Sequence, residues 1–201
     1  MTEAARKKIA AGLRWMIPAG LLRRFIRQQD GATAIEFAFV ALPFLALTFA
    51  ILETALVFFA GQTLEATATE AGRMVMTGQA QTAGYTSAAD FKTNVVCPAL
   101  GSSSLFTCAN VQVDVKTYTD FTSINSPTPI KDGALDTSKM CYAPGDAGAI
   151  VVVRLYYEWP IYLSLLNDSL SNLANGKRLL VATSVFRNEP FTTTGSSNTC
   201  P

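Results

Sequence analysis

The feature that most constrains this chain is an apolar run over residues 37–60, which follows directly after a basic segment. At a rise of about 1.5 Å per residue, a helix of this length crosses a hydrocarbon core about 30 Å thick with some tilt. Glu36 stands at the edge of the run, where a carboxylate costs less than the roughly 2.5–3.5 kcal/mol of a helix centre. The sequence therefore predicts a membrane helix that begins beside the carboxylate of Glu36. Because this carboxylate is kept at a cost, we expect it to have a function.

Charge is distributed unevenly around this run. Residues 1–30 hold seven Lys or Arg against Glu3 and Asp30, a net charge of +5, and the remaining residues hold nine against thirteen, a net charge of −4. Basic residues just before a first span hold that flank in the cytoplasm, so we expect the C-terminal part on the far side. The adjoining span explains the basic residues as a topology signal, and we expect no nucleic-acid partner.

The leader differs from an ordinary secretory signal, in which an apolar core of about 7–15 residues precedes a small-x-small cleavage site. Here a leader of mixed polarity ends at Gly31, and the long apolar run follows it. Cleavage after Gly31 would leave the membrane helix on a mature chain of 170 of the 201 residues, beginning at Ala32. The alternative is an uncleaved signal anchor, in which Gly31 only starts the helix.

The order of basic leader, Gly31, four neutral residues, Glu36 and membrane helix resembles the processing site of bacterial type IV-like prepilins. Within the helix, Pro43 and Glu53 narrow this to a resemblance to the TadE-like (TadE/TadF) family of tight-adherence, or Flp-type IVb, pilus proteins. The segment Phe186-Arg187-Asn188-Glu189-Pro190-Phe191 is similar to the Arg-x-Glu-Pro ending of that family.

The resemblance implies a minor pilin or pseudopilin, not an enzyme, that a prepilin peptidase cleaves between Gly31 and Ala32. In such proteins the glutamate before Phe37, here Glu36, meets the free amino group of an adjacent subunit, here at Ala32. The implied partners are the prepilin peptidase, the Flp-type major pilin, other minor pilins, the inner-membrane pilus assembly platform and membrane lipid. The implied location is the bacterial inner membrane, single-pass, with a cytoplasmic N-terminus and a periplasmic C-terminal domain. A TadE-type and a TadF-type role stay open, as does incorporation into the pilus.

Two residues inside the run need separate interpretations. Pro43 lacks an amide hydrogen and is expected to kink the helix, which membrane helices tolerate when neighbours satisfy the freed carbonyl. Glu53 lies toward the outer end, where we favour a side chain that reaches the headgroup region over one that contacts another helix.

Periodicity predicts that the helix continues beyond the membrane for about 45 residues in all. An apolar stripe recurs at steps of three and four residues and is expected to pack on the chain's own domain: Ala60, Leu64, Ala68, Ala71 and Val75. Glu70 and Arg73 are spaced to pair across one turn. Gly78 and Gly84 are candidate stop signals.

The remaining residues predict an α+β domain of pilin-like plan, in which the long helix packs on a small antiparallel β-sheet. Strands are expected over residues 111–118, 149–159 and 179–186, from their alternating or continuous apolar character. Leu163, Leu166, Leu170 and Leu173 predict a short amphipathic helix closed by Asn175-Gly176. Residues 122–140 are rich in Ser, Pro, Thr and Asp and are interpreted as a long loop, and Asp132-Gly133 as a turn.

The four cysteines, Cys97, Cys108, Cys141 and Cys200, all follow the apolar run, which suits two disulfides in an oxidising periplasm. Three pairings are possible. We favour Cys97–Cys108, which flank a Gly/Ser turn, and hence Cys141–Cys200. A zinc site is the alternative, but the chain has no Cys-x-x-Cys and no histidine.

Catalytic constellations are scarce, and no cofactor or metal is expected. The absence of histidine excludes Ser-His-Asp and Cys-His machinery, and no phosphate-binding glycine motif is present. The expected organisation is a leader over 1–31, a transmembrane helix over 32–60, a periplasmic helix extension over 61–84 and a periplasmic domain over 85–201. The alternative function is a permanently membrane-anchored periplasmic binding module of the cell envelope, and an anchored enzyme comes third.

Overall fold

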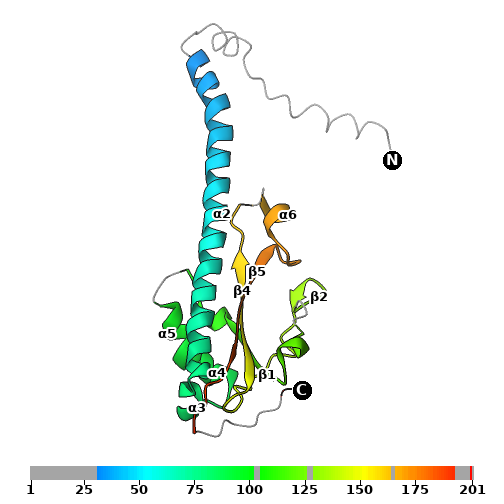
Figure 1. Ribbon diagram of the computed structural model, residues 1–201. Helices are drawn as coiled ribbons and strands as arrows, with labels where there is room; N and C mark the ends of the chain where they lie inside the picture. The colour runs from blue at the N-terminus through cyan, green and yellow to red at the C-terminus, as the bar shows by residue number, and fades with distance from the viewer. Residues whose placement is uncertain (1–30, 102–104, 126–128, 164–165, 193–199, 201) are drawn as a thin grey trace, which may run out of the picture. The chain divides into compact units, whose positions relative to one another are not determined.

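The computed structural model describes residues 31–101, 105–125, 129–163, 166–192 and 200, so the predicted leader lies outside it except for Gly31. By its contacts the chain divides into two units, residues 1–48 and 49–201, and each is described by itself. Figure 1 shows the elements. In order they are α2 (Ala32–Met76), α3 (Gln79–Thr82), α4 (Ala88–Phe91), the π-helix η3 (Lys92–Val96), α5 (Cys97–Leu100), the 3-10 turn η4 (Cys108–Asn110), β1 (Gln112–Tyr118), the 3-10 turn η5 (Phe121–Ser123), β2 (Ile130–Lys131), β3 (Ala134–Leu135), β4 (Ile150–Pro160), α6 (Asn167–Leu170) and β5 (Lys177–Arg187).

The C-terminal part of α2 packs on the sheet through the predicted apolar stripe. All five stripe residues, from Ala60 to Val75, are at most 1% exposed and belong to one core with β1, β4 and β5. Gly72 allows the close approach, since a Cβ there would lie 2.7 Å from Ser184 Oγ and 2.9 Å from the Phe186 ring. The 45-residue length of α2 and the packing of its stripe are confirmed.

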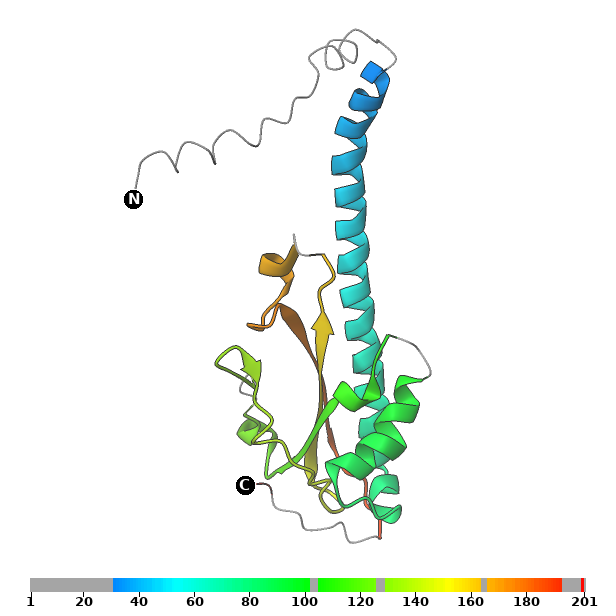
Figure 2. The same cartoon turned by 180° about the vertical axis from the view of Figure 1, so that it is seen from behind.

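The sheet has the order β1-β4-β5, with both pairings antiparallel, so β4 is the central strand. Side chains alternate along β4, and those from Val151 to Trp159 at odd numbers enter the core shared with α2. Those on the other face include Arg154 and Tyr156, over which the β2–β3 hairpin lies (Figure 2). The predicted α+β class and the three predicted strands are confirmed.

The amphipathic helix expected from Leu163 to Leu173 is wrong beyond one turn, because only α6 is helical there; residues 164–165 lie outside the described part. The side-chain oxygen of Asn172 accepts a bond from Leu179 N at 2.7 Å, and Leu173 N donates to Lys177 O at 3.1 Å. These bonds to the start of β5 replace the helical ones, since short polar side chains compete with a helix for backbone groups.

Two further segments differ from the expectation. The loop predicted over 122–140 contains the hairpin β2–β3, whose turn is Asp132-Gly133 with φ of 52° and 74°. Residues 88–100, for which the sequence predicted no helix or strand, form the continuous helical stretch α4, η3 and α5. The sequence does carry a signal for the start of this stretch, since serine is a preferred N-cap residue. In the structure Ser87 is the N-cap, and its Oγ accepts the hydrogen bond of Asp90 N.

Two disulfides join the cysteines in the favoured pairing. Cys97 is bonded to Cys108 and Cys141 to Cys200, with Cα–Cα distances of 5.7 and 5.8 Å. These spacings lie in the usual range for disulfides. Both bonds together use all four thiols of the chain, which leaves no cysteine for the alternative zinc site.

Candidate functional site

The candidate site is the start of α2. The helix begins at Ala32, directly after Gly31, and Glu36 stands one turn into it with an exposed side chain. Among the described residues, Glu36 forms no ion pair. A Cβ built on Gly31 meets no atom within 4 Å, so folding does not require glycine there.

The helix that follows is long and apolar enough to cross a membrane. The only such helix among the described residues is the stretch Thr33–Met76, and its most apolar window is not buried. Phe37 and Phe39 are 73% and 78% exposed, as expected of a surface that faces lipid. The helix continues through Pro43, and Thr48 Oγ1 donates to Phe44 O at 2.8 Å within the same stretch. One apolar helix of this kind fits a membrane anchor.

Glu53 is neither exposed to water nor directed at another helix, in contrast to both sequence interpretations. Its side chain is buried, 4% exposed, and Oε1 accepts a hydrogen bond from Tyr162 N at 3.1 Å. Tyr162 follows Ile161 at the end of β4, so the carboxylate fixes that end of the sheet against α2. A buried carboxylate that accepts a backbone N–H has part of its desolvation cost offset.

The C-terminal motif holds the opposite end of the same interface. Asn188 is 3% exposed, and its Nδ2 donates to Pro144 O and to Asp146 O, each at 3.0 Å. Glu189 N donates to Met76 O at 2.9 Å and so satisfies a carbonyl at the C-terminus of α2. The motif that carries part of the family resemblance is therefore structural, and it ties β5 to the end of the helix.

The Asn188→Ala variant is expected to lower the free energy of unfolding by roughly 1–3 kcal/mol, because the buried Pro144 carbonyl and the part-buried Asp146 carbonyl each lose one of their donors. Arg187→Ala is the matched control: the side chain is exposed and donates to Gly148 O at 2.9 Å. We expect about 1 kcal/mol or less for the control, the usual range for one exposed hydrogen bond. Urea unfolding of the full chain in detergent measures both, and equal losses would contradict the account of Asn188.

The exposed helix surface beyond the stripe carries the predicted pair of Glu70 and Arg73. Arg73 Nη2 lies 2.6 Å from Glu70 Oε1, and its hydrogen bond lowers the pKa of the Glu70 carboxyl. Both side chains are about half exposed, so the pair contributes little to stability.

Comparison with known proteins places the family segment at this site. Residues 31–73 match the family model described as TadE-like protein. No curated protein and no solved structure matches the chain. The matched segment starts at Gly31 and includes Glu36, Pro43 and Glu53, on which the sequence resemblance rests. This match points to involvement in a Tad pilus system as a membrane-associated structural component. Over residues 31–73, this chain is thus similar to the TadE-like family, as the sequence resemblance predicted.

Proposed function

We propose that the protein is a minor pilin or pseudopilin needed to assemble a Flp-type pilus, and that a prepilin peptidase cleaves it after Gly31. The observation that carries the proposal is the coincidence of three features at the start of α2. The family match begins at Gly31, helix α2 begins at Ala32, and the exposed carboxylate of Glu36 follows one turn later.

Cleavage at this place creates the partner that the carboxylate needs. An uncleaved chain presents an amide at Ala32, whereas the cleaved chain presents a protonated amine. A carboxylate at the edge of a lipid-embedded helix is tolerated when it is paired, and the amine of an adjacent subunit supplies that pair. After processing, the helix can leave the bilayer and join a helical bundle with the major pilin and other minor pilins. This step takes place at the inner-membrane assembly platform.

The rest of the molecule is suited to a domain carried on the far side of the membrane. The basic residues before Gly31 favour a cytoplasmic N-terminus, and two disulfides suit an oxidising periplasm. Glu53 and Asn188 hold the domain to α2 near two ends of their interface. The domain and the helix from residue 49 onward would therefore move as one unit during assembly.

The alternative, a permanently anchored binding module of the envelope, needs no cleavage. The two proposals differ in what a bulky residue at position 31 does. Gly31→Leu is expected to abolish the loss of residues 1–31, because a peptidase that requires a small residue before the scissile bond cannot accept the side chain. Gly31→Ala is expected to retain partial cleavage.

Gly61→Leu is the control, since at this helical position too an added Cβ meets no atom within 4 Å. Immunoblots of cells with the prepilin peptidase measure the shift in mobility. Full processing of Gly61→Leu with none of Gly31→Leu is the expected result. Identical mobility of wild type and Gly31→Leu would contradict the proposed function.

A further inference from the structure

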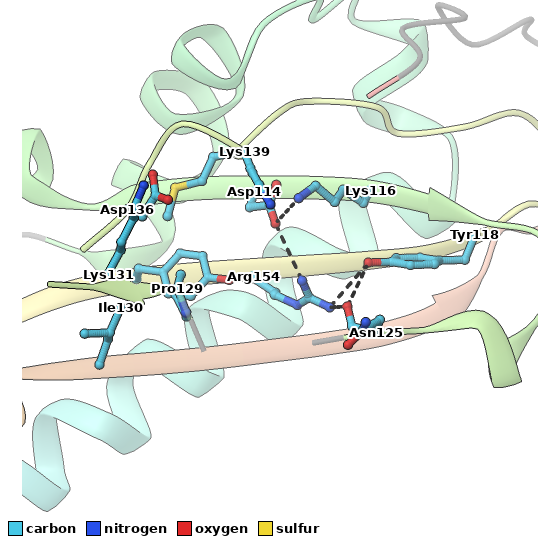
Figure 3. Close-up of a pocket in the computed structure, with 12 residues that line it drawn as sticks. Asp114, Lys116, Tyr118, Asn125, Pro129, Ile130, Lys131, Asp136, Lys139 and Arg154 are labelled. Carbon is cyan, nitrogen blue, oxygen red and sulfur yellow. Dashed lines mark hydrogen bonds and ion pairs between the residues drawn. The ribbon is translucent and has the colours of Figure 1, made fainter. Parts of the chain in front are cut away.

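A cavity of about 350 Å³ lies on the face of the sheet that turns away from α2, between β1, β4 and the β2–β3 hairpin (Figure 3). Asp114 and Arg154 form its floor, Lys131 and Lys139 stand at its rim, and Ile130 and Tyr156 supply apolar wall. Neither the family segment at residues 31–73 nor the proposed assembly contact includes any of these residues.

The floor is set by the strand register. Asp114 on β1 lies directly opposite Arg154 on β4, and both are buried, at 3% and 4% exposure. Asp114 accepts the hydrogen bond of Cys141 N at 3.0 Å, and its Oδ2 lies 3.3 Å from Lys116 Nζ. One buried carboxylate thus faces two cations, so the floor keeps an excess positive charge.

The guanidinium of Arg154 is poorly satisfied for a buried group. Nη1 lies 3.7 Å from Asp114 Oδ2, and Nη2 reaches Asn125 O at 3.3 Å and Tyr118 Oη at 3.5 Å. Nε has no hydrogen-bond partner among the described residues. Charged N–H···O bonds normally measure about 2.7–2.9 Å, so three long contacts leave much of this group's bonding capacity unused.

The rim adds to the positive charge. Lys131 and Lys139 are exposed, and Asp136 is the lining carboxylate that stands with them at the rim. The whole lining has four cations and two carboxylates. Tyr156 is already neutral at pH 7 at the ordinary pKa of about 10, and burial raises the pKa of its hydroxyl further, so this side chain adds no negative charge.

We propose that this cavity binds a carboxylate attached to an apolar or aromatic body, with the carboxylate toward Arg154 and the body against Ile130 and Tyr156. A planar carboxylate matches the fork of a guanidinium, and the two rim lysines increase its local concentration. The chemistry is shared by the C-terminus of a protein chain and by a small organic acid.

The test uses the full chain in detergent micelles, with N-acetylphenylalanine as the probe and its neutral amide as the matched control. Isothermal titration is expected to give a Kd of about 0.1–1 mM for the acid, the range that a ligand of this size reaches. We expect the amide to bind at least about tenfold more weakly. Raising the salt concentration should weaken the binding of the acid, because its attraction to the cavity is electrostatic.

Lys131→Gln and Lys139→Gln are each expected to raise the Kd for the acid by about threefold or more, since the two lysine charges stand at the open rim. Arg73→Gln removes one exposed cation from α2, away from the cavity lining, and should leave the Kd unchanged. Arg154→Lys keeps the charge but loses the fork and should weaken binding further. Because the rim variants change exposed side chains, they test the proposal even if the Arg154 variant does not fold.

A peptide that ends in phenylalanine distinguishes the two sources. Tighter binding of the peptide acid than of N-acetylphenylalanine assigns the site to a protein C-terminus, and binding of the small acid alone assigns it to a free acid. Three results would overturn the proposal: equal affinity for acid and amide, no binding of either acid below about 10 mM, or rim variants that bind like Arg73→Gln.

Discussion

Glu36→Gln should insert into the membrane and be cleaved, yet lose its co-purification with the major pilin by at least about a hundredfold. Loss of one partner from a buried ion pair costs roughly 3–5 kcal/mol, because the remaining charge stays desolvated and unpaired. The scissile bond and the basic leader are unchanged, so processing should persist at least in part. Insertion should improve slightly, since the charge penalty at the edge of the run is removed.

Two carboxylates on the same helix serve as comparisons. Glu65→Gln changes an exposed side chain beyond the apolar run and should assemble normally. Glu53→Gln keeps an oxygen that can accept from Tyr162 N, so we expect only a small effect on assembly. Pull-down with the major pilin and counts of pili measure all three variants. Normal assembly of a processed, stable Glu36→Gln protein would refute the assembly contact and favour the anchored binding module.

Removal of the Cys141–Cys200 disulfide should be the most destabilising change in the C-terminal domain. The bond closes a loop with a sequence separation of 59 residues. Its loss by double substitution with serine is expected to cost about 4 kcal/mol in the chain-entropy account, against about 3 kcal/mol for the Cys97–Cys108 bond of separation 11.

Thermal unfolding of the full chain in detergent measures both double variants, and thiol labelling of protein from the envelope supplies the companion test. Wild type should show no reactive cysteine in the native state. Two labelled thiols in native wild-type protein, or unchanged unfolding of the Cys141→Ser/Cys200→Ser variant, would contradict the role given to this bond.

Local periodicity explains why much of the fold was predictable. The stripe on α2 and the alternation along β1 each place apolar side chains on one face, and burial of that face determines the packing. The Gly/Ser turn between Cys97 and Cys108 favoured the observed disulfide pairing over the two other pairings, but the sequence did not decide among the three. The start of the family segment was visible because it combines four signals along one stretch of sequence: basic residues, Gly31, Glu36 and the apolar run.

Contacts between distant segments were beyond this kind of reasoning. The bond from Tyr162 N to Glu53 spans 109 residues, and no local pattern indicates that a carboxylate in an apolar run has a backbone partner just beyond the end of β4. The pairing of Asp114 with Arg154 depends on a strand register that alternation alone does not fix. The short helix expected over residues 163–173 failed because Asn172 and Leu173 bond to β5 instead.

The most direct test of the account is zero-length cross-linking between Glu36 and a subunit amine in membranes of cells with the complete pilus system. A membrane-permeant carbodiimide joins a carboxylate to an amine only where the two are in contact. The account predicts, by mass spectrometry, a chain that begins at Ala32 and an intermolecular peptide that joins Glu36 to the N-terminal amine of a neighbouring subunit. A chain that still carries residues 1–31, with Glu36 in no cross-link, would contradict it.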